Sequence, residues 1–206
     1  MLERDNRLGK NIVEIIDRNR SIRFGTGLVA RFKRKDGVEK AYILTAQHVV
    51  EEQPVNVVDF QGSVHPLRFH NLQGRDLAIS KVPKAFPKLE GLLVAKKENT
   101  TEVYLASKMK GNIIIKEAKY KGGLLDHTFL ITTVGEHFDG GGFSGSPILN
   151  SENEVLGILI QGTDNYWTGV PSSNYVTEGL FNHENKLSLK RKLTSKVNIL
   201  RLVFGR

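Results

Sequence analysis

The feature of this sequence that most restricts its fold is a series of short β-rich segments spaced closely along the chain. The segments are rich in β-branched and aromatic residues, and turn signals such as Asp36-Gly37 separate them. Many short strands joined by turns favour antiparallel barrels or a sandwich over alternating strands and helices, so the sequence predicts an all-β fold. The expected strands cover residues 24–32, 38–45, 55–60, 64–69, 77–82, 103–107, 113–120, 128–134 and 155–161.

The N-terminal segment has a different pattern. Its apolar residues Ile12, Val13, Ile15 and Ile16 lie among polar ones at a spacing nearer to helical than to strand periodicity. We therefore expect residues 1–23 to form an N-terminal arm or a short helix.

The C-terminal segment 186–206 combines apolar residues at helical spacing with a concentration of positive charge. It holds seven basic residues and no acidic one, which leaves 30 − 7 = 23 basic residues against 22 acidic ones elsewhere. We interpret it as a basic amphipathic helix whose apolar face packs on the body of the protein. The alternative is a weak contact with nucleic acid or another acidic surface. The apolar residues at helical spacing are Leu189, Leu193, Val197, Leu200 and Val203.

The composition excludes several classes of protein. With no cysteine, the fold cannot use disulfides, zinc–thiolate sites or a thiol nucleophile. No run approaches 18 apolar residues, which argues against a transmembrane helix. The charged start of the chain lacks the apolar core of a signal peptide, so an intracellular, cytoplasmic location is the default expectation.

A glycine-rich loop carries the strongest chemical signal. Gly140-Gly141-Gly142 gives a backbone that can adopt positive φ and present its N–H groups, and it leads through Phe143 to Ser144. Taken alone, the loop reads as a flexible connector. It runs directly into the apolar Pro147-Ile148-Leu149, however, so Ser144 is a candidate nucleophile. The N–H groups of Gly142 and Ser144 are the candidate oxyanion-hole donors.

A histidine and an aspartate upstream are suited to activate this serine. His48 follows the apolar strand that ends near Thr45, where a rigid scaffold can expose a side chain to a cleft. Asp76 directly precedes the apolar strand Leu77-Ala78-Ile79, and a half-buried carboxylate there can orient an imidazole. Alone, Asp76 would be interpreted as a turn residue. Together, the three residues suggest a Ser-His-Asp triad.

Three motifs resemble those of the chymotrypsin-like serine proteases, in that family's chain order. They are Thr45-Ala46-Gln47-His48-Val49, Asp76-Leu77-Ala78-Ile79 and Gly142-Phe143-Ser144-Gly145-Ser146-Pro147. Gly25-Thr26-Gly27-Leu28-Val29 also resembles the family's first strand. The resemblance spans roughly residues 24–162, and its most specific part is the serine motif.

The resemblance implies two six-stranded antiparallel β-barrels with the active site between them. His48 and Asp76 would lie on the first barrel and Ser144 on the second, and a helix would follow at the C-terminus. Pro83 and Pro87 mark the boundary, because they interrupt the strand pattern. The expected divisions are the arm or helix 1–23, the first barrel 24–82, a linker 83–95, the second barrel 96–185 and the basic helix 186–206.

One departure from the family pattern concerns activation. Secreted digestive members have an aspartate before the serine, which pairs with a newly cut N-terminus. Here Phe143 occupies that position, so the ion pair is not available. With no cysteine, the chain is closer to compact viral or bacterial members than to digestive enzymes.

The resemblance also indicates where substrate binds. Residues shortly before the serine, His137, Phe138 and Asp139, would line the primary pocket. Asp139 would favour a basic substrate side chain and Phe138 a shallow or apolar pocket, and the sequence leaves both open. No histidine lies in 155–160, which weakens a preference for Glu or Gln. Ile160-Gln161-Gly162 resembles the edge strand that pairs with the substrate backbone.

The main hypothesis is therefore a serine endopeptidase that acts on polypeptides through an acyl-enzyme, without a metal or organic cofactor. A second hypothesis is a catalytically silent, protease-like binding module that acts through its basic segment 186–206. An esterase on the same serine is disfavoured. The α/β-hydrolase elbow needs Gly-x-Ser-x-Gly before a helix, and Ser146-Pro147 follow Gly145 instead.

Overall fold

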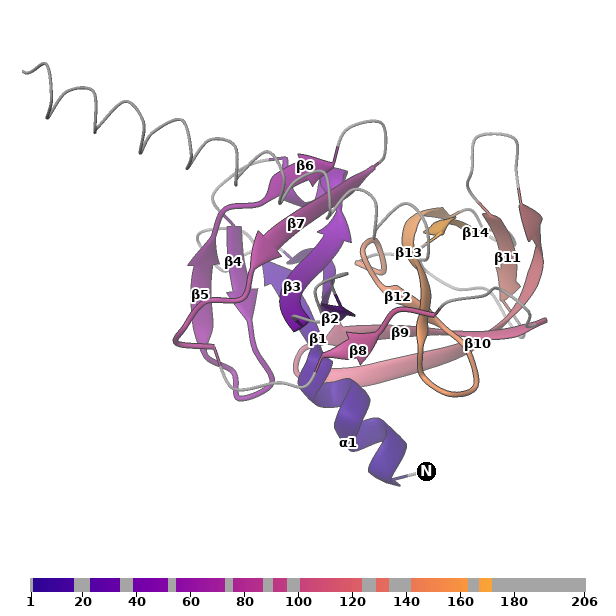
Figure 1. Cartoon of the computed structure of the whole chain (residues 1–206), viewed down its shortest axis with the longest axis horizontal. Helices are drawn as coiled ribbons and strands as arrows, with labels where there is room; N and C mark the ends of the chain where they lie inside the picture. Colours follow the sequence, from indigo (N-terminus) through magenta and orange to yellow (C-terminus); the bar gives the residue numbers. More distant parts are fainter. Residues whose placement is uncertain are drawn as a thin grey trace, which may run out of the picture.

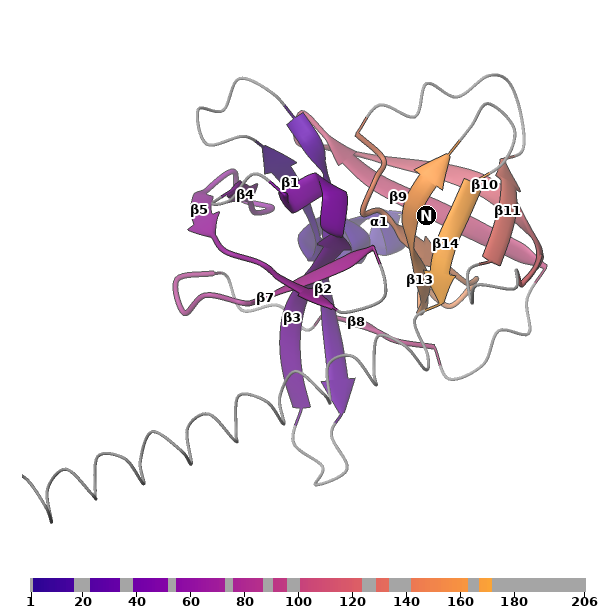
Figure 2. The same ribbon diagram turned by 90° about the horizontal axis from the view of Figure 1, so that it is seen from above.

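Two curled, mostly antiparallel β-sheets lie side by side, and a helix, α1 (Leu2–Asn11), begins the chain (Figure 1). Seen from above, the second sheet curls into a barrel beside the first (Figure 2). The all-β, two-barrel architecture is thus confirmed. The computed structural model describes residues 2–16, 23–33, 39–51, 55–72, 76–86, 91–95, 101–123, 129–133, 142–162 and 167–171.

The first sheet has the strand order β5-β4-β1-β2-β3-β7-β6, with β8 paired in parallel to β2. The strands β2, β3, β4, β5 and β7 correspond to the five strand segments expected within 24–82, and β6 is an additional short strand that was not expected. Two more join them from flanking segments expected to lie outside the barrel. The bounds are β1 (Ile12–Ile16), β2 (Arg23–Lys33), β3 (Glu39–Ala46), β4 (Val55–Val58), β5 (Val64–Leu67), β6 (His70–Leu72), β7 (Leu77–Lys81) and β8 (Leu92–Leu93).

A short helix, α1, does occur within 1–23, but the interpretation of Ile12 to Ile16 as helical was wrong. These residues form β1, a central strand between β2 and β4, and α1 lies directly before them. Both faces of β1 are buried, because Ile12 packs in one apolar cluster and Val13 and Ile15 in another. A strand covered on both faces does not alternate apolar and polar residues, which is why its period was misread.

The second sheet closes into a six-stranded barrel, β10-β11-β14-β13-β12-β9. Strand β14 was not expected, because residues 163–185 are mostly polar and rich in turn-forming residues. The predicted basic helix 186–206 lies outside the described residues. The bounds are β9 (Glu102–Met109), β10 (Asn112–Gly123), β11 (Phe129–Thr133), β12 (Pro147–Leu149), β13 (Val155–Gly162) and β14 (Trp167–Pro171).

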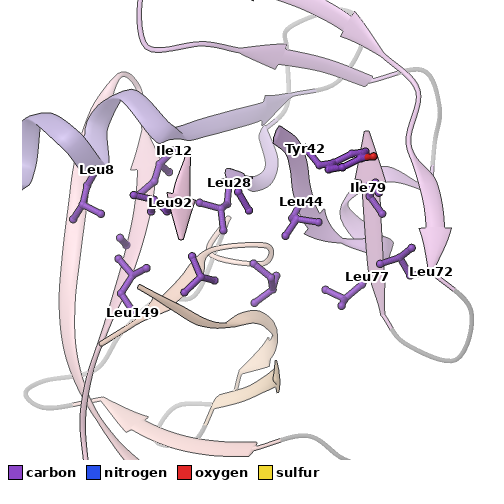
Figure 3. Packing of buried hydrophobic residues seen from close by; sticks show 14 residues of the cluster. Leu8, Ile12, Leu28, Tyr42, Leu44, Leu72, Leu77, Ile79, Leu92 and Leu149 are labelled. Atoms are coloured by element: carbon purple, nitrogen blue, oxygen red, sulfur yellow. The ribbon is translucent and has the colours of Figure 1, made fainter. Parts of the chain in front are cut away.

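A shared apolar cluster joins the two sheets. Leu28 and Leu44 of the first sheet pack with Leu149 and residues of β13, and Leu8 of α1 covers one end (Figure 3). A buried polar contact adds to it, since Lys108 Nζ on β9 donates to the backbone carbonyl of Asp59 at 2.8 Å. The two sheets are therefore packed against each other through their cores. This packing fixes the boundary between the sheets, called the seam below, where the candidate residues lie.

The described parts of the expected linker, residues 83–86 and 91–95, pack against both sheets. Phe86 is buried in the core of the first sheet, β8 pairs with β2, and Val94 forms a bridge to Val155 of the second. Among the described helices, none is long and apolar enough to cross a membrane.

Candidate active site

His48 and Asp76 are brought together by the pairing of β3 with β7. These strands run antiparallel with Ala46 opposite Leu77, so the end of β3 and the start of β7 meet at one edge of the sheet. His48 lies just beyond β3 in a short 3-10 helix, η1 (Gln47–Val50), and Asp76 just before β7. The predicted placement of both residues at strand ends is confirmed.

Asp76 holds His48 with both carboxylate oxygens. Its Oδ2 lies 2.6 Å from His48 Nδ1, and its Oδ1 accepts the backbone N–H of His48 at 3.0 Å. The backbone N–H of Gln47 also donates to the Asp76 carbonyl at 3.2 Å. The imidazole is thus fixed by its ring and by its own backbone, which selects the tautomer with a proton on Nδ1 and leaves Nε2 as the acceptor.

The pair is electrostatically coupled. The hydrogen bond to Asp76 raises the pKa of His48 above its ordinary 6.5, against the opposing effect of burial. Burial acts to raise the pKa of Asp76, but the hydrogen bonds from the His48 side chain and backbone outweigh it and hold this pKa below 3.8. At neutral pH, Asp76 is therefore ionised and favours a protonated His48.

Ser144 lies in a tight turn anchored to the core of the second barrel. The backbone N–H of Ser146 donates to the Phe143 carbonyl at 2.9 Å, and Gly145 between them has φ of 85°. That left-handed conformation favours glycine. Phe143 is only 1% exposed and packs in the apolar cluster of the barrel, whereas Ser144 is partly exposed.

Strand β13 holds the next part of the serine turn. Gly145 N–H donates to the Leu159 carbonyl at 2.8 Å, and Leu159 N–H donates to the Ser146 carbonyl at 2.9 Å. The turn is therefore fixed on one side by the second barrel.

The serine turn packs directly on the strands that carry His48. Thr26 N–H on β2 donates to the Ser144 carbonyl at 2.9 Å. A Cβ placed on Gly25 would lie 2.6 Å from the Ser144 carbonyl oxygen and 2.8 Å from Val49, the neighbour of His48. Gly145 of the serine turn also lies close to the first sheet, because a Cβ on Gly145 would clash with the Thr26 carbonyl and with Thr45 Oγ1.

The structure thus brings the three predicted residues to one seam between the sheets. Among the described residues, no hydrogen bond joins Ser144 Oγ to His48. Catalytic hydrogen bonds are often long in ligand-free proteins and tighten when substrate binds.

The predicted oxyanion-hole donors lie in this turn. Gly142 has φ of 80°, and its carbonyl accepts a hydrogen bond from Thr26 Oγ1 at 3.2 Å. Within the described part of the chain, the N–H groups of Gly142 and Ser144 have no acceptor. No described group therefore competes for these two donors.

The predicted substrate residues are only partly described. Residues Ile160, Gln161 and Gly162 form the end of β13, with Gln161 and Gly162 exposed. Strand β13 pairs with β14 through Gly162, whereas its pairing with β12 ends at Ile158. The pocket residues His137, Phe138 and Asp139 lie outside the described residues.

Sequence reasoning missed three buried hydroxyls behind the serine turn. Thr26, Thr45 and Ser107 are fully buried and hydrogen-bonded, and Thr26 contacts the turn itself. Thr26 and Thr45 belong to stretches already noted for their resemblance, but no residue pattern singled out their hydroxyls. In the described segments, no group of three His, Asp or Glu side chains could hold a metal ion.

The fold is shared by solved serine proteases. The chain is similar to a serine protease of a human pathogenic astrovirus, with a TM-score of 0.62 and 18% identity over 79% of this chain and 90% of that one. It is also similar to the active form of the Rv3671c protease from M. tuberculosis, with a TM-score of 0.65 and 18% identity over 87% and 84% of the two chains. For a serine endoprotease from Yersinia pestis the TM-score is 0.62, with 18% identity over 82% and 61%.

Comparison of the sequence with models of protein families identifies the family of this chain. A search of curated protein sequences finds no significant match. The family model for the trypsin-like peptidase domain matches residues 25–158, which is more than half of the chain and includes the His48, Asp76 and Ser144 motifs. The chain therefore belongs to the trypsin-like peptidase family, the serine endopeptidases that its motifs resemble.

Proposed function

We propose that the chain hydrolyses peptide bonds with Ser144 as nucleophile, His48 as general base and then general acid, and Asp76 as the carboxylate that orients the imidazole. The observation that carries this proposal is the two-point hydrogen bond of Asp76 to His48, at the seam where the serine turn packs on β2. A carboxylate that fixes the histidine tautomer beside a serine is the arrangement that nucleophilic acyl transfer requires.

The proposed reaction has two halves. In the first, His48 Nε2 takes the Ser144 proton while Oγ bonds to the peptide carbonyl carbon, and the N–H groups of Gly142 and Ser144 stabilise the oxyanion. The C–N bond then breaks, His48 gives its proton to the departing amine, and an ester on Ser144 remains. In the second half, His48 takes a proton from water, the hydroxide attacks the ester, and Ser144 leaves with that proton restored.

The substrate is a polypeptide, and the end of β13 is the proposed place for its backbone. The exposed Gln161 and Gly162 lie past the point where β12 stops pairing, which suits addition of an extended peptide beside Ile160. His137, Phe138 and Asp139 are proposed to line the pocket for the side chain that precedes the cleaved bond.

The proposal predicts covalent labelling of one serine. A fluorophosphonate probe is expected to modify Ser144, with the Oγ–P bond forming as fluoride leaves, because His48 activates this hydroxyl. Mass spectrometry of the labelled protein measures the site. Ser144→Ala and His48→Gln should both abolish labelling. Ser146→Ala is the matched control, because the Ser146 side chain is fully buried and makes no hydrogen bond in the described structure, so its loss should leave labelling intact. Labelling that survives Ser144→Ala would falsify the assignment.

The coupling of His48 to Asp76 predicts a pH dependence. A protonated His48 cannot accept the serine proton, and its pKa is raised above 6.5, so the labelling rate should be less than half maximal at pH 6.5 and rise above it. The rate constant for labelling of wild type, measured from pH 5 to 9, gives the midpoint. His65, which pairs with Asp59 at 2.9 Å, supplies a control. His65→Gln should leave the midpoint unchanged, and a wild-type midpoint below 6.5 would count against His48 as the base.

A further inference from the structure

Two buried hydroxyls and a backbone carbonyl form a series of hydrogen bonds behind the serine turn. Thr26 Oγ1 on β2 lies 2.8 Å from Ser107 Oγ on β9 and 3.2 Å from the Gly142 carbonyl, to which it donates. Both side chains are fully buried. These hydrogen bonds therefore run from Ser107 in the second barrel, through Thr26 in the first sheet, back to Gly142 beside the serine turn.

The number of hydroxyl hydrogens limits which group donates in each of these hydrogen bonds. A hydroxyl carries one hydrogen, and Thr26 donates its hydrogen to the Gly142 carbonyl. Both contacts are made at once when Ser107 donates to Thr26 and Thr26 donates to Gly142. Because a hydroxyl that accepts a hydrogen bond becomes a stronger donor, Ser107 strengthens the hold of Thr26 on Gly142.

Thr26 holds two carbonyls of the turn at once. Its side chain donates to the Gly142 carbonyl, and its backbone N–H donates to the Ser144 carbonyl. The peptide that carries the Ser144 N–H lies between these two, and its own carbonyl, that of Phe143, accepts from Ser146. In a trans peptide the N–H points opposite to the carbonyl, so the contact of the Phe143 carbonyl with Ser146 turns the Ser144 N–H away from Ser146.

Gly142 is the point at which this arrangement is most easily lost. It has φ of 80°, and a glycine can leave that conformation at little steric cost. In the described part of the structure, the hydrogen bond from the Thr26 side chain to the Gly142 carbonyl opposes such a rotation. A rotated Gly142 would misdirect the oxyanion-hole N–H groups without unfolding the protein.

We propose that the Thr26 hydroxyl, with Ser107 behind it, is a positioning group that keeps the oxyanion hole formed in the absence of substrate. Thr26 touches no reacting atom and acts through the backbone of Gly142. This inference rests on the proposed function of Ser144. It adds that Thr26, a residue of the opposite sheet, maintains the shape of the oxyanion hole.

The test compares three substitutions in this chain of hydroxyls. Thr26→Val removes the hydroxyl at nearly constant volume and keeps the backbone N–H, and Thr26→Ser restores the hydroxyl. Because losing an oxyanion-hole donor outright lowers rates about 10²- to 10³-fold, we expect Thr26→Val to slow fluorophosphonate labelling by about 10- to 100-fold. Thr26→Ser should label nearly as fast as wild type. Ser107→Ala should show a smaller loss, and adding it to Thr26→Val should cost nothing further, since both act on one contact.

Ser80→Ala is the matched control for Ser107→Ala. Ser80 is a nearly buried serine on β7 whose hydroxyl donates to the Lys81 carbonyl at 3.4 Å. Its removal should leave the labelling rate unchanged. The pH midpoint of labelling should also stay at the wild-type value in Thr26→Val, because the His48 and Asp76 pair is untouched.

A second readout does not depend on catalysis. Amide hydrogen exchange in a peptide covering residues 142–146 should speed up in Thr26→Val and Ser107→Ala and not in Ser80→Ala. If wild type is not labelled at all, the proposed function fails, and the exchange rates still decide whether Thr26 holds the turn. Unchanged exchange, or a wild-type labelling rate in folded Thr26→Val, overturns the inference. If Thr26→Val does not fold, Ser107→Ala decides by the same two readouts.

Discussion

Asp76→Asn is expected to lower the rate of Ser144 labelling at neutral pH by about 10⁴-fold, because it selects the wrong tautomer of His48. In the structure, Asp76 Oδ1 accepts the His48 backbone N–H, so the asparagine oxygen must occupy that position. Its NH₂ group then faces Nδ1, where Oδ2 lies in the native protein at 2.6 Å. Nδ1 must become an acceptor and Nε2 must carry the proton, which leaves no base for Ser144.

The measurement is the labelling rate constant of Asp76→Asn across pH, with thermal unfolding to confirm that the variant is folded. Asp59→Asn is the control, since Asp59 also pairs with a histidine, at 2.9 Å, but lies in the turn between β4 and β5. It should reduce stability and leave the labelling rate of the folded protein near wild type. Wild-type labelling of Asp76→Asn would show that another group orients His48.

The sequence predicted the His48 and Asp76 pair because its signals were local. Each residue flanks a strand with a clear apolar pattern, and pairing of those strands is enough to bring the two together. The serine turn was also identifiable, because its glycines and the following apolar run are contiguous. Its approach to His48 depended on the family resemblance, since Thr26 and Ser144 are distant in sequence and meet only when the sheets pack.

The features that sequence reasoning missed all depend on tertiary packing. Strand β1 was misread because both of its faces are covered, and β8 was missed because a two-residue strand has no period. The Ser107 and Thr26 hydroxyls were missed because serine and threonine in strands are ordinary, and their contact spans 81 positions. Packing between sheets leaves no periodic trace in one sequence, so these contacts required the structure.

Phe143→Asp is expected to lower the free energy of unfolding by about 4 kcal/mol or more, because it combines a lost core aromatic with a buried carboxylate. Truncating a buried Phe typically costs about 3–5 kcal/mol, and an unpaired charge in an apolar site costs more. Phe143 is 1% exposed and packs with Leu105, Ile148 and Leu156. These three neighbours are aliphatic and cannot form a hydrogen bond with an aspartate.

Urea unfolding of Phe143→Asp and Phe143→Leu measures the effect, with the slope against urea used to confirm the same transition. Phe143→Leu keeps an apolar side chain and should cost only about 1–2 kcal/mol, because the cavity it leaves is small. It should also keep most of the labelling rate, since the turn remains anchored. A Phe143→Asp variant as stable as Phe143→Leu would mean that the carboxylate finds a partner, as it does in the secreted members. The expected result instead means that apolar packing, in place of an ion pair, seats the serine turn as the chain folds.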